Sequence, residues 1–400
     1  MSTQIAFLID NDGTRWTGGV QYLTNLFYAI RQADPQKDYK ICAVLAPSVQ
    51  LKEASTLSVH LDEVIPFPNN NLWLRLWHQK QIRVLKNRLG IRYQPEAALS
   101  SLLRRKHIKA LFSAVALEMR YRLPVIGWIP DFQQSHLPEM FSPAEVLSRN
   151  EDNRKLSAAA QIILLSSQSA KTDFEKLFPE YASKARVLPF ATPVPEEIFS
   201  EDCERVCKLY HLPRRFFYLP NQFWKHKNHQ IVLEALTIAH QSQPEITVVC
   251  TGNLNDGRNP LYSSELLAQV SERGLRDRFI VLGMVPRSHL YQLMRQSLAV
   301  LQPSLFEGWS TTVEEVKSIG KRIILSDIPV HREQNPPQAI YFSPHDPVSL
   351  AKIMVEVFQS AQPGPDTVLE AQARACVTAR VAVFGKGFLQ IVDEVCVAKP

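Results

Sequence analysis

Residues 297–329 constrain the fold of this chain most, because their residue pattern follows the order strand, loop, helix, strand. Short apolar runs at 297–301 and 322–326 predict the two strands, and apolar positions recur with helical spacing between them. Gly320 supplies a residue that can take a left-handed conformation and end the helix. Such a unit places its loop at the carboxyl edge of a parallel sheet, where open α/β sheets bind ligands.

Two glutamates, eight positions apart, flank the expected start of this helix. Glu307 lies in the loop and Glu315 in the first turn of the helix. The helix start leaves free backbone N–H groups on Ser310, Thr311 and Thr312, and together with the helix dipole these suit a phosphate. The two glutamates would then accept hydrogen bonds from sugar hydroxyls.

The same residues also fit a purely structural role. Thr311 with Glu314, and Thr312 with Glu315, have the spacing of a capping box, in which a glutamate satisfies donors at the helix start. The spacing alone fits capping and ligand binding equally. Glu307 favours ligand binding, because it precedes the helix and cannot cap it in this way.

Strands alternating with helices extend over the whole chain and predict parallel, doubly wound sheets. The other expected strands are 5–9, 41–45, 110–112, 125–128, 161–165, 186–188, 216–219, 246–250, 279–282 and 339–342, and the clearest helices are 20–31, 228–241 and one from about 347. A proline-rich linker at 189–195 separates two halves, and a length of 400 residues suits two domains. Two such halves would place their ligand-binding edges face to face across a cleft.

Composition and targeting signals exclude several classes of protein. With 45% hydrophobic and 21% charged residues, the chain is globular rather than disordered. No apolar run approaches the roughly 18 residues of a membrane span, and residues 1–10 resemble a strand rather than a signal peptide. The six cysteines show neither metal-ligand nor disulfide spacing, which predicts reduced thiols in the cytoplasm.

Residues 64–95 form a basic segment, with six lysines and arginines and no acidic residue. Because Trp73 and Trp77 accompany these cations, residues 72–92 could lie on an anionic membrane surface. The alternative, which the apolar spacing favours, is a helix packed in the core with a solvated basic side. No nucleic-acid partner is expected, because the net charge of +6 is mild and no recognition module is present.

Several of these segments together resemble a known family. The pair Glu307 and Glu315 is similar to the E-x7-E signature of retaining glycosyltransferases of family 4, and residues 220–229 resemble their phosphate loop. Residues 128–139 resemble their acceptor-side loop, and Gly18 with Gly19 the glycine-rich turn after the first strand. The likeness continues to residues 383–389. It implies the GT-B fold, in which two doubly wound Rossmann-like domains face each other across a cleft.

The resemblance also assigns site residues. The expected donor-binding residues are Gly18, Gly19, Gln222, Lys225, Lys227, Glu307, Gly308, Ser310, Thr311, Thr312 and Glu315, and the expected catalytic residues are Glu307, Lys227, His136 and Asp131. Lys227 would neutralise the donor diphosphate, Glu315 would bind the ribose and Glu307 the donor sugar. No cofactor and no metal are expected. Asp10 and Asp12 have the form of a metal-binding motif, but they follow the first strand, whereas metal-dependent transferases with another fold carry that motif in mid-chain.

Two departures from the family pattern bear on the site. Gln222 stands where the family commonly has an arginine, and Lys225, Arg287 and Arg322 are the alternatives for the missing charge. Pro130 precedes Asp131 where many members have a histidine, so either His136 or Asp131 would take the polar role at the acceptor.

The resemblance implies a metal-independent, retaining, hexosyl-type transferase that moves a sugar from a nucleotide-sugar to a hydroxyl of a glycan or lipid-linked acceptor. The expected context is polysaccharide biosynthesis in the cytoplasm, with peripheral contact at the inner membrane surface through residues 72–92. The expected domains are residues 1–193 for the acceptor, 194–375 for the nucleotide-sugar, and a helix at 376–400 that crosses back. Gln222 and Pro130 also suggest an alternative, a catalytically silent sugar-nucleotide-binding protein.

Overall fold

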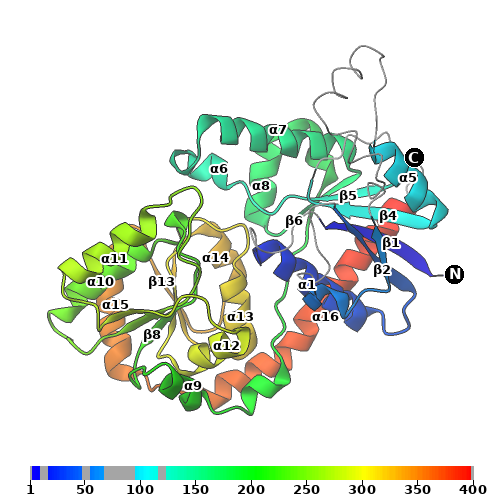
Figure 1. Cartoon of the computed structure of the whole chain (residues 1–400). Helices are drawn as coiled ribbons and strands as arrows, with labels where there is room; N and C mark the ends of the chain where they lie inside the picture. The colour runs from blue at the N-terminus through cyan, green and yellow to red at the C-terminus, as the bar shows by residue number, and fades with distance from the viewer. Residues whose placement is uncertain (1, 10–16, 47–54, 67–94, 116–122, 398–400) are drawn as a thin grey trace, which may run out of the picture.

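The structure, a computed structural model, describes residues 2–9, 17–46, 55–66, 95–115 and 123–397 (Figure 1). It contains one parallel sheet of seven strands and another of six, each covered by helices on both faces. The expected architecture of two doubly wound α/β halves is therefore confirmed. We call the two halves the N-lobe and the C-lobe.

The N-lobe is built on the seven-stranded sheet. Its strands are β1 (Thr3–Ile9), β2 (Tyr39–Leu45), β3 (Glu63–Pro66), β4 (Ile108–Ser113), β5 (Val125–Trp128), β6 (Ile162–Leu165) and β7 (Ala185–Val187), in the order β3-β2-β1-β4-β5-β6-β7. Helices α1 (Thr17–Ala33), α2 (Ser55–Ser58) and α16 (Thr367–Val397) cover one face, and α5 (Pro95–Arg105), α7 (Pro143–Ala159) and α8 (Gln168–Leu177) cover the other. The short helices are α6 (Gln133–His136), η1 (Pro138–Met140) and η2 (Pro179–Lys184).

The C-lobe repeats this plan. Its strands are β8 (Phe217–Leu219), β9 (Val248–Cys250), β10 (Phe279–Val281), β11 (Val300–Gln302), β12 (Ile323–Ser326) and β13 (Ala339–Phe342), in the order β10-β9-β8-β11-β12-β13. Helices α10 (His229–His240), α11 (Tyr262–Glu272) and α15 (Pro347–Ser360) cover one face, and α9 (Cys203–Leu209), α12 (Arg287–Gln296) and α13 (Thr311–Ile319) cover the other. The short helices are η3 (Glu196–Phe199), η4 (Lys225–Lys227) and α14 (Pro329–Gln334).

Each strand expected from an apolar run is present, with each end within three residues of its expected position. The edge strand β3 was not expected, because its short apolar run has no alternating pattern and it forms by pairing with β2. Gly320 ends α13 with φ 79°, as expected.

Gly18 and Gly19 lie in the first turn of α1, so the expectation that they form a turn before the helix is wrong. Glycine disfavours a helix by about 1 kcal/mol. Packing outweighs this preference here, because Tyr22, Leu26 and Phe27 on the next turns are buried in the N-lobe core.

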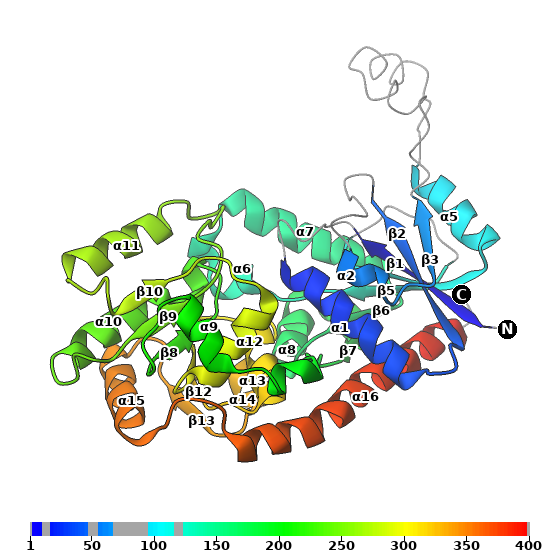
Figure 2. The same ribbon diagram turned by 60° about the horizontal axis from the view of Figure 1, so that its bottom comes forward.

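Helix α16 joins the two lobes (Figure 2). It begins at Thr367 rather than at residue 376, because its first turns pack on the C-lobe beside α13. A Cβ on Gly320 would lie 2.3 Å from the carbonyl oxygen of Leu369, and one on Gly385 would lie 2.1 Å from that of Ala29 in α1. Glycine at these two positions therefore allows α16 to approach both lobes closely.

Within the described ranges, α16 alone is long and apolar enough to cross a membrane, contrary to the sequence expectation. The core helix of a soluble protein meets the same criterion. Here the apolar side chains of Val381, Phe384, Phe388 and Val392 are buried in the same core as α1 and the N-lobe sheet.

We predict that Gly385→Ala lowers the free energy of unfolding by about 1–3 kcal/mol, because the new methyl group meets the backbone of α1. Gly387→Ala is the matched control in the same helix. Its Cβ would meet the end of the Leu188 side chain, at 2.7 Å, which can move, and alanine favours the helix. Chemical denaturation of both variants measures the difference; equal stabilities would contradict the tight approach of α16 to α1.

Candidate functional site

Glu307 is the centre of a cluster at the carboxyl edge of the C-lobe sheet. Its Oε1 accepts hydrogen bonds from Lys227 Nζ at 2.6 Å, Ser304 Oγ at 2.7 Å and Gln302 Nε2 at 2.9 Å. Lys227 comes from η4, after β8, whereas the other three residues follow or end β11. Because β8 and β11 are neighbours in the sheet, residues far apart in sequence meet here, and the structure brings Lys227 and Glu307 together; their roles in donor binding stay predictions.

The Glu307 carboxylate is ionised at neutral pH. Burial alone would raise its pKa, but the positive charge of Lys227 and its hydrogen bond outweigh burial and hold the pKa below the ordinary 4.5. Burial, assisted by the charge of Lys227, lowers the pKa of His226 to about 3, so this neighbouring ring is neutral. Lys227 is therefore the cation that faces the carboxylate.

Helix α13 has Ser310 as its N-cap, and the Ser310 Oγ accepts a hydrogen bond from the N–H of Val313 at 3.4 Å. Both capping-box alternatives are therefore wrong, because the helix begins at Thr311 and the third position falls on Val313. Glu314 instead pairs with Lys317 at 3.0 Å and with Arg380 of α16 at 3.1 Å.

The N–H groups at the start of α13 are not all available to a ligand. The N–H of Ser310 donates to Gln334 Oε1 at 3.1 Å, and the Ser310 carbonyl accepts from Gln334 Nε2 at 3.0 Å. The expectation that the Ser310 N–H is free is therefore wrong. For the N–H groups of Thr311 and Thr312, the described part of the chain supplies no hydrogen-bond acceptor.

Glu315 is buried and pairs with Arg287, whose Nη2 donates to Glu315 Oε1 at 2.6 Å. Burial raises the pKa of Glu315, and the adjacent guanidinium offsets part of that rise. Arg287 Nε also donates to the hydroxyl of Tyr291 at 2.6 Å. Glu315 therefore depends on Arg287 for its charged state.

Arg322 and Lys225 are the other two candidates for the positive charge that is missing at Gln222. Arg322 directly precedes β12, so it lies at the sheet edge opposite the site, and this alternative is wrong. Gln222 Oε1 accepts a hydrogen bond from the N–H of Asn253 at 2.7 Å, which holds the loop after β9 in place. Lys225 is exposed, and its role in donor binding stays a prediction.

The N-lobe loop that contains Asp131 and His136 contacts the donor-side loop directly. The ring of His136 stacks on the ring of Phe306, with 4.8 Å between the ring centroids. A Cβ on Gly308 would lie 2.2 Å from the carbonyl oxygen of Pro130. Gly308 is therefore required for the close approach of the two lobes. The structure thus places both predicted acceptor residues beside the Glu307 loop.

Asp131 and His136 differ in their surroundings. Asp131 Oδ1 accepts hydrogen bonds from the N–H of Gln133 at 3.1 Å and from Arg149 Nη2 at 3.0 Å, so it shapes the loop. His136 Nε2 lies 2.7 Å from Asp173 Oδ2, and 43% of the His136 side chain is exposed. Their catalytic roles stay predictions.

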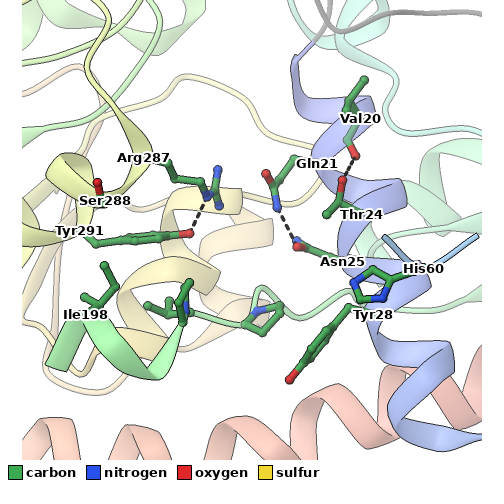
Figure 3. A pocket seen from close by; sticks show the side chains of 13 residues that line it. Val20, Gln21, Thr24, Asn25, Tyr28, His60, Ile198, Arg287, Ser288 and Tyr291 are labelled. Carbon is green, nitrogen blue, oxygen red and sulfur yellow. Dashed lines mark hydrogen bonds between the residues drawn. The ribbon is translucent and has the colours of Figure 1, made fainter. Parts of the chain in front are cut away.

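A cavity of about 610 Å³ lies between the lobes next to Arg287 (Figure 3). It is lined by Val20, Gln21, Thr24, Asn25 and Tyr28 of α1, by His60, by Pro193, Val194, Pro195 and Ile198, and by Arg287, Ser288 and Tyr291 of α12. Figure 3 shows Arg287 and Gln21 pointing toward one another from opposite walls. Gly18 and Gly19 directly precede this lining on α1 and are not part of it, so their role in donor binding stays a prediction.

Three site residues carried no assignment from the sequence. Gln302 and Ser304 both donate to Glu307, and Gln334 occupies the Ser310 N–H. A polar residue that ends an apolar strand, as Gln302 does, is the signal that could have found the first of them. Among the described residues, no three His, Cys, Asp or Glu side chains are grouped to hold a metal, and Asp10 and Asp12 lie outside those residues.

Comparison with known proteins agrees with this geometry. Residues 211–375 match the family model of the glycosyl transferases group 1. No curated protein matches the chain in sequence. The C-lobe therefore carries a glycosyl transferases group 1 domain.

The whole chain resembles several solved structures in fold. HepE from Anabaena, in complex with UDP and glucose, has a TM-score of 0.70 and 16% sequence identity over 98% of this chain and 100% of HepE. Sucrose-phosphate synthase from Thermosynechococcus elongatus has a TM-score of 0.66 and 14% identity, over 99% of this chain and 100% of the synthase. The UDP-forming trehalose-phosphate synthase of Burkholderia vietnamiensis has a TM-score of 0.59 and 11% identity, over 98% of this chain and 100% of that one. The expected GT-B fold is confirmed.

We predict that Glu307→Gln lowers the free energy of unfolding by about 2 kcal/mol at neutral pH, because Lys227 loses its buried counter-charge. A carboxylate with a lowered folded-state pKa stabilises the fold above its unfolded-state pKa, near 4.5, and loses this contribution as pH falls through the folded value. The difference between wild type and variant should therefore shrink in acid.

Denaturant titrations from neutral to acidic pH test this expectation. Glu356→Gln, on the exposed side of α15, is the matched control, and its effect should be small at every pH. A difference that is independent of pH would mean that Glu307 is not held ionised by Lys227.

Proposed function

We propose that this glycosyltransferase is a retaining, metal-independent, hexosyl-type enzyme that transfers a sugar from a nucleoside-diphosphate sugar to a hydroxyl of a glycan or glycolipid. The observation that carries the proposal is the Lys227–Glu307 pair, which lies at the same sheet edge as the start of α13, in a loop whose Phe306 stacks on His136 of the N-lobe. The complexes of HepE with UDP-glucose and with UDP and glucose support a nucleotide-sugar donor.

The chemistry requires a cationic site for the leaving group. As the glycosidic bond to the diphosphate breaks, negative charge develops on the phosphate oxygens. Lys227 and the N–H groups of Thr311 and Thr312 are fixed donors that would stabilise this charge without reorganisation.

The two glutamates would bind hydroxyl groups on either side of the diphosphate. The three hydrogen bonds to Glu307 converge on Oε1, which leaves Oε2 for the donor sugar. Glu315 would accept from the ribose, and His136 would orient the acceptor hydroxyl from the opposite lobe. Retention would follow from attack on the face from which the phosphate departs, so Glu307 need not act as a nucleophile.

We predict that Lys227→Ala and Glu315→Ala each lower the rate of sugar transfer by about a hundredfold, equivalent to about 3 kcal/mol of transition-state stabilisation. Transfer and donor hydrolysis are measured with a panel of UDP-, GDP- and ADP-sugars. Lys352→Ala, an exposed position on α15, should leave both rates unchanged. If both site variants are folded and transfer sugar at the wild-type rate, the site assignment is wrong.

Metal independence has its own test. The proposed cations at the diphosphate are side chains and backbone N–H groups, so we predict that excess EDTA leaves the transfer rate unchanged. Activity that is lost with EDTA and restored by Mg²⁺ or Mn²⁺ would contradict this part of the proposal.

A catalytically silent sugar-nucleotide-binding protein is the second candidate. It is favoured by Gln222, whose side chain holds the loop after β9 and adds no charge to the site. Binding of a nucleotide-sugar in calorimetry, without donor cleavage or transfer to any acceptor tested, would support this candidate over the enzyme.

For its place in the cell, we propose polysaccharide biosynthesis in the cytoplasm, with peripheral contact at the inner membrane surface. The proposed contact segment, residues 72–92, lies outside the described residues. Its support is the mixture of tryptophans and cations in the sequence. Sedimentation with anionic vesicles tests the contact, and recovery of all protein in the supernatant would refute it.

A further inference from the structure

Arg287 lies where the proposed ribose site meets the cavity between the lobes. Its guanidinium spans Glu315 on one side and the hydroxyl of Tyr291 on the other, with both hydrogen bonds at 2.6 Å. The side chain still keeps 43% of its surface exposed, whereas the Glu315 side chain keeps 5%. A guanidinium has five N–H donors, so these two contacts leave donors for a ligand.

We propose that Arg287 is the second cation of the diphosphate site: it pairs with Glu315 while the site is empty and binds the phosphate nearest the ribose when a nucleotide is present. This inference rests on the proposed function, because it assumes a nucleoside diphosphate whose ribose contacts Glu315. It adds a positioning residue that neither the family match nor the structural neighbours assign.

The balance of charge in the site supports this role. Lys227 and Glu307 form a close ion pair and cancel each other in formal charge. Glu315 is a second buried carboxylate, so whenever it is charged the cluster without Arg287 would be negative. A diphosphate would then meet net repulsion in a region of low dielectric. Arg287 removes this repulsion, and Gln222 cannot do so because it carries no charge.

The order of residues along α13 indicates that Arg287 can contact the phosphate nearest the ribose. Thr311 and Thr312 open the helix, and Glu315 follows about one turn later. In a nucleotide, the first phosphate is joined to the ribose by the 5′ carbon and oxygen alone. A ribose on Glu315 therefore brings its phosphate between Glu315 and the start of the helix. Arg287 already touches Glu315, so a rotation of its side chain suffices to meet this phosphate.

The cavity provides room for that rotation. Its walls carry the amides of Gln21 and Asn25, which hydrogen-bond each other at 2.7 Å, and the hydroxyl group of Ser288. Figure 3 shows the guanidinium directed toward this polar part of α1. The guanidinium therefore faces the polar part of a cavity whose other walls, at Pro193 to Pro195 and Ile198, are apolar.

A simpler role for Arg287 would be that of a permanent counter-charge to Glu315. The two roles differ in which part of the nucleotide they affect. A counter-charge alone acts through the charge of Glu315, so once Glu315 is made neutral it changes the binding of a nucleoside and of its diphosphate by the same factor. A phosphate contact affects the diphosphate only.

Calorimetry with uridine and UDP, or with the nucleoside and diphosphate of the base that the donor panel selects, separates these roles. The readout is the factor by which the diphosphate improves affinity over the nucleoside. We expect Arg287→Met to reduce this factor roughly tenfold or more. We expect Arg287→Lys to restore part of it, since lysine keeps the charge but not the paired donors.

Glu315→Gln supplies a background in which Glu315 has no charge to balance. In that background Arg287→Met should still reduce the improvement by a similar factor. Arg322→Met is the matched control, because it removes an arginine from the opposite edge of the same sheet, and it should leave the improvement unchanged.

An unchanged improvement factor for Arg287→Met in the Glu315→Gln background would overturn the inference and leave Arg287 as the counter-charge of Glu315. Failure of the wild-type chain to bind any nucleoside diphosphate would instead overturn the proposed function. The two failures are therefore distinguishable in the same experiment.

Discussion

The ion pair between Lys227 and Glu307 is the interaction on which the organisation of the site depends. It joins the loop after β8 to the loop after β11, and two further donors, Gln302 and Ser304, converge on the same carboxylate oxygen. A buried carboxylate with three partners is fixed in position and in charge. The loop that carries Glu307 then leads directly into α13, so the direction of its free N–H groups is set by the same contact. Preorganisation of this kind favours stabilisation of a developing phosphate charge.

The two lobes meet around this pair. The Pro130 carbonyl lies against Gly308, the His136 ring stacks on Phe306, and the indole N–H of Trp309 donates to the carbonyl of Phe190 at 3.0 Å. These contacts all involve the short loop between β11 and α13. Helix α16 also connects the two lobes. It packs closely on the C-lobe at Gly320 and, through its own Gly385, on α1 of the N-lobe. A loop that carries Glu307, the residue proposed to bind the donor sugar, and also contacts the N-lobe can couple donor binding to the relative position of the lobes.

The second ion pair, between Arg287 and Glu315, gives the site a different property. The pKa of Glu307 is lowered by its partner, whereas the pKa of Glu315 is raised by burial that its partner only partly offsets. The pKa values of the two glutamates of one signature are therefore shifted in opposite directions. Lys227 favours the charged form of Glu307, but the charge of Glu315 depends on Arg287, which is itself partly exposed at a cavity.

The sequence alone determined the two-lobe α/β architecture, the strands within a few residues, and the position of Lys227, Glu307 and Glu315 at one sheet edge. These features follow from apolar periodicity, from Gly320 and from a recognisable motif, all of which are local in the chain. Tertiary structure decided the rest. Gln334 accepts the hydrogen bond of the Ser310 N–H, and Arg287 rather than Arg322 contacts Glu315. Packing of α1 on the N-lobe core places Gly18 and Gly19 inside the helix. The physical reason is that each of these contacts joins residues from different elements, and their distances depend on how helices pack on the sheets and not on spacing along the chain.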